Sequence, residues 1–270
     1  MKLSNILSRR NRILLRELVV TDFKLRYQGS VLGVLWSVLK PLFLFAILYI
    51  VFDKFLKLGR DIEHFPVYLL LGVVLWSFFT EATTQGLNSI VSRGDLIRKI
   101  NFPKYIIVIS GTISALINVS ISLAVVVIFM VINGVNIELP AILAIPLLLE
   151  LYIFSLAIAF FLASINVKLR DVGYLWEIFL QAAFYATPIL YPLQMVMKQS
   201  EFAAKLLLLN PVAQVVQDMR YVLVTHQTVR LWELVGASWV LLIPFGIIVG
   251  VAILAVIYFR KNQTKFAEQL

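Results

Sequence analysis

Six long apolar stretches constrain the fold of this chain more than any other feature of its sequence. They cover approximately residues 31–52, 67–90, 105–132, 142–165, 175–189 and 234–258. A helix rises about 1.5 Å per residue, so about twenty residues cross a bilayer core of about 30 Å. The fifth stretch is short and runs into Pro188 and Pro192, which interrupt helices. The pattern predicts an all-α integral membrane protein with six transmembrane helices.

The composition supports this class and excludes several others. Of the 270 residues, 61% are hydrophobic and 14% are charged, which is more apolar surface than one soluble core can bury. The chain has no cysteine and two histidines, which excludes disulfides and argues against a thiolate or histidine metal centre. The net charge of +9 lies in short connections, which favours membrane lipids over nucleic acid as the partner.

The positions of lysine and arginine predict the orientation. With the N-terminus inside, the segments 1–40, 91–104, 166–173 and 260–270 carry 17 basic residues, and the outer segments carry 7. Basic residues accumulate in cytoplasmic loops of membrane proteins. We therefore expect both termini in the cytoplasm.

A basic segment before the first span predicts an amphipathic helix over Arg9–Gln28. Polar and apolar side chains fall on opposite sides: Glu17, Thr21, Lys24 and Gln28 against Leu15, Leu18, Val19 and Phe23. Such a helix lies at an anionic membrane interface, although an ordinary solvated helix is the alternative. Asp22 and Arg26 have the spacing of a helical ion pair. The expected organisation is an interfacial helix at 1–30, a transmembrane domain at 31–260 and a cytoplasmic tail at 261–270.

The outer segment between the fifth and sixth spans contains two further apolar pieces, Ala203–Leu209 and Val212–Val224. Each is too short to cross a membrane. Two short re-entrant helices packed on protein would keep their apolar sides from water and their ends satisfied. Helices lying flat on the outer leaflet are the alternative.

No motif for catalysis is present. The sequence has no P-loop, no HExxH and no GxSxG, so we expect a chain without enzyme activity or a cofactor of its own. Glu81, within a span, lies among Thr80, Thr83, Thr84 and Gln85, and either lines a pathway or bonds between helices. Lys40 precedes Pro41 and either snorkels to the interface or forms a cation at the inner mouth.

Two inner loops and an aromatic cluster complete the candidate sites. Ser92–Pro103 reads SRGDLIRKINFP and predicts a short protruding helix from Gly94 to Lys99, suited to docking. The loop Asn166–Gly173, with Lys168, Arg170 and Asp171, can do likewise. Phe179, Phe184 and Tyr185 precede the break at Pro188 and either stack on sugar rings or simply pack.

Four stretches resemble a known family. They are FKLRYQGSVLGVLWSVLKPL (Phe23–Leu42), SRGDLIRKINFPKYI (Ser92–Ile106), NVKLRDVGYLWEIFLQAAFYATPILYP (Asn166–Pro192) and LNPVAQVVQDMRYVL (Leu209–Leu223). In order and spacing they resemble the ABC-2 type permeases that export O-antigen, capsule or teichoic acid. The resemblance implies a homodimer in the bacterial inner membrane, with two copies of a separate P-loop ATPase that bind ATP and Mg, and a glycan on undecaprenyl diphosphate as substrate.

The resemblance also implies roles for particular residues. The main contact with the ATPase would involve Arg93, Asp95, Leu96, Ile97, Arg98, Lys99, Phe102 and Pro103, and the second contact Arg170 and Asp171. Electrostatics adds Arg16, Arg26 and Lys40 as candidates where an anionic diphosphate enters. The channel between the protomers would be lined by Glu81, Phe179, Phe184 and Tyr185.

The segment Arg260–Leu270 resembles that of teichoic-acid permeases, which implies teichoic acid over O-antigen or capsule as the polymer. Three other functions are alternatives at this point. An ABC-2 permease for small drugs or antibiotics would share the six-helix plan. An ion-coupled secondary carrier would need no ATPase, but such carriers usually show internal repeats, and none is visible. A lipid-modifying membrane enzyme is disfavoured by the missing catalytic clusters.

Overall fold

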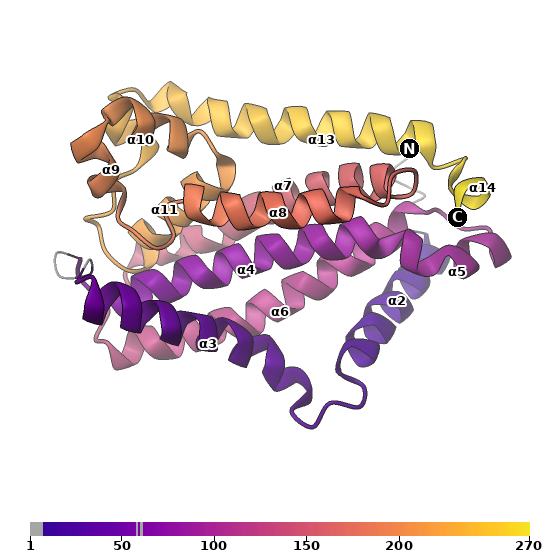
Figure 1. The fold of residues 1–270 in the computed structure, drawn as a ribbon, viewed down its shortest axis with the longest axis horizontal. Coiled ribbons are helices and arrows are strands. Elements are labelled where there is room, and N and C mark those ends of the chain that lie inside the picture. The colour runs from indigo at the N-terminus through magenta and orange to yellow at the C-terminus, as the bar shows by residue number, and fades with distance from the viewer. Residues whose placement is uncertain (1–7, 58, 60–61) are drawn as a thin grey trace.

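A computed structural model describes residues 8–57, 59 and 62–270 of the chain. Within this part, helices and turns account for the whole architecture and no β-strand occurs (Figure 1). Residues 1–7 of the expected N-terminal domain lie outside the described residues. The predicted all-helical fold is confirmed.

Five helical stretches of the described chain are long and apolar enough to span a membrane: Gly33–Phe55, Phe65–Ser89, Tyr105–Ile132, Leu139–Asn166 and Trp239–Asn262. Their main helices are α3 (Trp36–Tyr49), α4 (Phe65–Ser89), α6 (Tyr105–Ile132), α7 (Ala144–Asn166) and α13 (Leu242–Asn262). The predicted fifth span corresponds to α8 (Val172–Ala186), whose 15 residues lie alongside these helices in Figure 1 but fall short of a full crossing. The multi-pass architecture is confirmed, and a sixth span stays a prediction.

Helix α4 forms the centre of the bundle. Of its apolar window, 78% is buried, against 6% to 33% for the other four stretches. Gly86 lets α4 and α7 approach each other closely, because a Cβ there would lie 2.2 Å from the Cβ of Ala159 on α7. Small residues at such crossings let helix backbones pack tightly in membranes.

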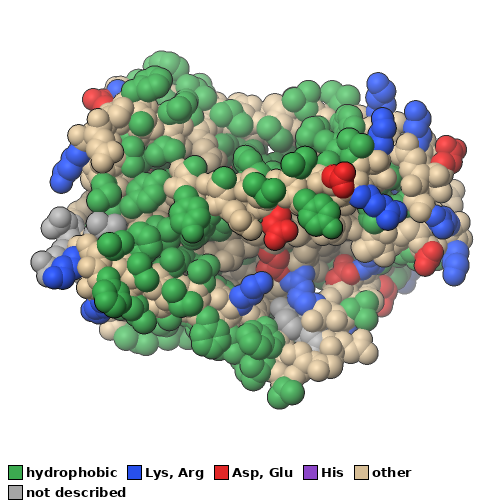
Figure 2. Space-filling view, viewed as in Figure 1, with side chains coloured by type: hydrophobic (Ala, Val, Ile, Leu, Met, Phe, Trp, Pro, Cys, Tyr) green, Lys and Arg blue, Asp and Glu red, His purple; other side chains and the backbone are tan. Residues whose placement is uncertain are grey.

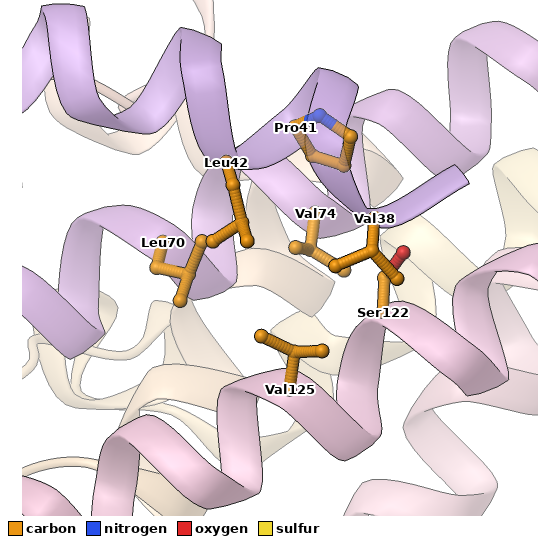
Figure 3. A pocket seen from close by; sticks show the side chains of 7 residues that line it. All are labelled: Val38, Pro41, Leu42, Leu70, Val74, Ser122 and Val125. Atoms are coloured by element: carbon orange, nitrogen blue, oxygen red, sulfur yellow. The ribbon is translucent and has the colours of Figure 1, made fainter. Parts of the chain in front are cut away.

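Helix α3 contains Pro41, which removes the N–H that would bond the carbonyl of Ser37. The hydroxyl of Ser122 on α6 donates to this carbonyl at 3.3 Å, so the break is satisfied from a neighbouring helix. Figure 3 shows the small cavity of about 10 Å³ beside it, where side chains of α3 face those of α4 and α6. The cavity is lined by Val38, Pro41, Leu42, Leu70, Val74, Ser122 and Val125, and is too small for a substrate.

The bundle has two distinct ends (Figure 1). The α5 end carries the short helices α5 (Gly94–Lys99) and α14 (Phe266–Gln269). The α10 end carries α9 (Leu193–Gln199), α10 (Glu201–Leu208), α11 (Pro211–Leu223) and α12 (Leu231–Val235). Helices α10 and α11 match the two predicted apolar pieces, whereas α9 and α12 were not predicted.

The last span begins later than predicted, at Trp239 instead of residue 234, and its main helix α13 begins at Leu242. The reason is Gly236, which adopts a left-handed conformation with φ of 72° and ends α12. At the other end of the chain, α2 (Arg9–Tyr27) confirms the predicted N-terminal helix to within one residue. The side chain of Ser8 caps it by accepting from the Asn11 N–H at 3.4 Å. Helices α2 and α3 form a V on the face seen in Figure 1.

Candidate functional site

Two ion pairs fasten α2 to the bundle. Asp22 pairs with Arg93, directly before α5, and also accepts from the hydroxyl of Ser110 on α6 at 3.3 Å. Arg26 pairs with Glu81 on α4. The expectation that Asp22 and Arg26 support each other is therefore wrong. Both lie on the side of α2 that packs against the bundle, where each charge needs a partner from another helix.

Glu81 is the centre of a polar cluster that joins three helices. Its Oε1 accepts from Arg26 of α2, from Gln85 of α4 at 2.7 Å and from Asn118 of α6 at 2.6 Å. The carboxylate and the Arg26 side chain are about 30% exposed, so the cluster lies at the surface of the chain. Bonding between helices, one of the two expected roles of Glu81, is present in the structure, and a pathway-lining role stays a prediction.

Charged side chains gather in the middle of the face that carries this cluster. Figure 2 shows basic and acidic groups between α8, α4 and the V of α2 and α3, with a largely apolar surface toward the α10 end and a larger group of charges at the α5 end. Lys40 of α3 and Glu177 of α8 are both exposed. Within the described chain, Lys40 forms no ion pair. Charges within a candidate membrane span, such as that of Lys40, require water, a ligand or another chain as a partner.

The three candidate aromatic residues lie on different sides of α8. Phe184 packs against Trp76 of the core, with ring centroids 5.9 Å apart. Tyr185 is 67% exposed and Phe179 is 53% exposed. Phe179 stacks on Trp176 at 4.9 Å. Consecutive positions on a helix point about 100° apart, so the periodicity of α8 could have separated Phe184 from Tyr185.

Helix α5 combines a buried anchor with exposed charges. Ile97 and Phe102 are buried in a cluster that also contains Leu18 of α2, Val167 after α7 and Phe259 of α13. Asp95, Arg98 and Lys99 are exposed, whereas Leu96 and Pro103 are half-buried. Burial lowers the pKa of Arg93, whose guanidinium faces Asp22. Any displacement of α5 therefore acts on α2, α6, α7, α13 and α14 (Phe266–Gln269) through one apolar cluster.

The remaining sequence candidates are solvent-accessible. Arg170 and Asp171 are exposed in the turn between α7 and α8. Arg16 is exposed on α2. These positions are compatible with contacts to a partner or a lipid headgroup.

Sequence reasoning missed Arg220 of α11, which is fully buried. It donates to the carbonyls of Tyr68, Pro188 and Ile189 at 3.1, 2.6 and 2.7 Å. Its guanidinium also lies 3.6 Å from the centroid of the Tyr68 ring. The sequence did indicate the need for such a residue, because the helix break at Pro188 leaves backbone carbonyls that need hydrogen-bond donors. Arg220 thereby joins α11 to α4 and to the end of α8.

A second missed feature is a pair of buried acidic residues where α11 packs against α7, Glu150 of α7 and Asp218 of α11. Glu150 of α7 is 8% exposed, and its Oε1 has no hydrogen-bond partner among the described residues. By its place in a span, Glu150 could have snorkelled to the interface or found a hydroxyl partner, but the structure instead buries it, with α11 packed against α7. Gln214 donates to Asp218 at 2.6 Å. Burial raises the pKa of Asp218 to about 6, against the opposing effect of this hydrogen bond.

The family of the chain follows from its sequence matches. The model of the ABC-2 type transporter family matches residues 13–224, from α2 to the end of α11. The chain belongs to the ABC-2 type transporter family. The predicted resemblance is thereby confirmed at the level of the family.

Curated relatives of this ABC-2 chain carry names that refer to export. An O-antigen export system permease protein RfbA from Myxococcus xanthus is 31% identical over 217 residues, which is 80% of this chain and 82% of the relative. A protein of the same name from Klebsiella pneumoniae is 27% identical over 251 residues, which is 92% of each chain. The similarity therefore covers the bundle and both of its ends.

Proposed function

We propose that this chain is the membrane permease subunit of an ABC transporter that exports a lipid-linked cell-surface polysaccharide across the bacterial inner membrane. The observation that carries the proposal is the match to O-antigen export permeases over as much as 92% of both chains. A relationship of this extent covers α2, α5 and the helices of the α10 end together. Because the chain lacks a P-loop, the energy must come from a separate ATPase subunit.

In this proposal α5 and the turn with Arg170 and Asp171 face the cytoplasm and dock two copies of that ATPase, which binds ATP and Mg. This docking role is supported by the exposure of Arg98 and Lys99, which are free to contact another protein, while the neighbouring Ile97 is buried in the bundle. A push on α5 reaches α6, α7 and α13 through the shared apolar cluster. It reaches α2 through the ion pair between Arg93 and Asp22. Rigid-body movement of packed helices is a common way to transmit such a change.

The substrate path runs along the face with the exposed charges. An undecaprenyl diphosphate headgroup is anionic and would meet Lys40, Arg16 and, once released from Glu81, Arg26. Phe179 and Tyr185 expose aromatic faces on which sugar rings stack. A second copy of the chain would close this face, since the exposed sides of α3 and α8 need apolar cover.

Several finer features belong to the same proposal. Helix α8 with residues 187–190 serves as the sixth span, and α10 and α11 re-enter the membrane at the exit. The polymer is O-antigen, capsule or teichoic acid, and the names of the relatives favour O-antigen over the teichoic acid that the C-terminal segment suggested. Those names also favour polysaccharide over drugs, and the ABC-2 family disfavours an ion-coupled carrier.

The test couples binding to transport. The chain would be expressed with its cognate ABC ATPase, identified by co-purification, in a host that lacks its own polysaccharide permease. Arg98→Glu with Lys99→Glu should lower ATPase stimulation and surface polymer by about tenfold, whereas Lys198→Glu at the α10 end should leave both unchanged. ATP hydrolysis by the purified chain alone, or export without any second subunit, would refute the proposal.

A further inference from the structure

The last residues of the chain pack against the α5 end. Phe266 is completely buried, and its ring meets that of Phe259 of α13 edge-on, with centroids 5.4 Å apart. Phe259 in turn meets Phe160 of α7 edge-on at 5.0 Å. Edge-to-face contacts of this kind hold aromatic rings in a defined orientation. Helix α14 is therefore fixed to the bundle by an aromatic anchor.

This anchored segment also touches α5. The side chain of Leu270 lies over Gly94, the first residue of α5, because a Cβ at Gly94 would be 3.5 Å from the Leu270 Cβ. Ile97 is the one fully buried side chain of α5 itself. A helix of six residues with one buried side chain has little to hold it in place. Residues 263–270 therefore help to set the position of α5, together with Ile97, Phe102 and the ion pair of Arg93.

A shallow cavity of about 380 Å³, largely open to solvent, lies between the two segments. One wall is the connection from α5 to α6, with Asn101, Phe102, Pro103 and Lys104, and the other is the turn before α14, with Gln263 and Thr264. Residues with amide, hydroxyl and ammonium groups line it from both sides, together with Phe102 and Pro103. An open cavity of this size has room for one or two side chains of a partner.

The surroundings of the cavity are basic. Among residues 93–104 and 260–270 the basic side chains are Arg93, Arg98, Lys99, Lys104, Arg260, Lys261 and Lys265, and the acidic ones are Asp95 and Glu268. Arg93 is paired internally with Asp22, which leaves six basic residues against two acidic residues for an external partner. Surfaces of opposite charge complement each other at protein interfaces, so the partner group is acidic.

We propose that this cavity is a socket on the ATPase-docking surface, and that it receives an acidic side chain of the ABC ATPase subunit. The docking surface is then a composite of α5 and residues 263–270, not α5 alone. This inference rests on the proposed function, in which α5 contacts the ATPase. It adds a second segment, which lies more than 160 residues away in the sequence, to that contact.

The test blocks the socket without changing α5. Because the chain has no cysteine, Thr264→Cys gives a single reactive site on the exposed rim. Co-purification of the ATPase should be normal for the unlabelled variant and fall at least tenfold after reaction with a bulky maleimide. The same label on Gln199→Cys, exposed at the α10 end, should have no effect. Normal co-purification with the labelled Thr264→Cys variant would overturn the inference.

Charge reversal provides a second, independent measurement. Lys104→Glu should weaken ATPase binding about tenfold, and an acidic-to-basic change on the ATPase should restore it. Binding that is unchanged by Lys104→Glu would count against an acidic partner group. A loss with Arg98→Glu but not with either socket variant would refute the socket and keep the proposed function. If the wild-type chain captures no ABC ATPase, the proposed function itself fails.

Discussion

The crossing of α4 and α7 at Gly86 offers the most direct test of the packing. In Gly86→Ala the new Cβ would lie 2.2 Å from the Cβ of Ala159, which is 1.2 Å short of the 3.4 Å at which ordinary contact begins. The Ala159 Cα lies 2.9 Å away and is backbone, so no flexible side chain can move aside. The two helices must separate, and overpacking of this kind costs about 1–3 kcal/mol.

This cost should appear as a loss of thermal stability. At about 2–4 °C per kcal/mol for a chain of this size, Gly86→Ala should lower Tm by about 2–12 °C. The assay is fluorescence-detected size-exclusion chromatography of heated, detergent-solubilised protein. Gly250→Ala on α13 is the matched control, because a Cβ there meets nothing within 4 Å and alanine is the better helix former.

A second substitution separates this steric explanation from a general effect of alanine. Ala159→Gly removes the methyl group that the new Cβ would strike, so the double variant exchanges the two residues across the crossing. The double variant should recover most of the lost Tm. The reasoning is refuted if Gly86→Ala melts like the wild type, or if Ala159→Gly fails to rescue it.

Three further predictions concern charged groups. Arg26→Glu places two carboxylates together at Glu81 and should reduce export at least tenfold, and the exchange Arg26→Glu with Glu81→Arg should restore part of it in a surface-polymer assay. Arg220→Lys leaves at least one buried carbonyl without a donor, costing about 1–3 kcal/mol each, and should lower Tm more than Arg230→Lys does. The raised pKa of Asp218 means that the folded state holds its proton more tightly than the unfolded state does. The contribution of Asp218 to stability is therefore complete below its ordinary pKa and is lost as the pH rises through about 6. Asp218→Asn should flatten the decline of Tm between pH 4 and 7 in detergent, and an unchanged profile would argue against this assignment.

Features with a local cause could be predicted from the sequence. The apolar length of five spans, the amphipathic pattern of α2 and the Gly94–Lys99 helix all depend on neighbouring residues. The start of α13 was predicted wrongly because Gly236 was overlooked as a helix end. This error concerns the boundary of one helix and leaves the order of the helices unchanged.

Features that depend on distant partners could not be predicted. Asp22 and Arg93 are 71 residues apart, and nothing in either segment indicates the other. The same holds for Arg220, whose carbonyl partners come from α4 and from the end of α8. The burial of Glu150 depends on α11 covering it, which its own helix does not reveal. One sequence shows that each of these charges needs a partner, but it does not show which.

Helix α3 makes far fewer contacts with the rest of the chain than the other spans do, since only 6% of its apolar window is buried. Because α3 loses few contacts within the chain when it moves, its position depends mainly on the lipid, detergent or protein around it. Bilayer thickness, detergent micelle or neighbouring polypeptide should therefore alter the angle of α3 while α4 stays in place. Structures determined in different lipid environments should differ chiefly at this helix.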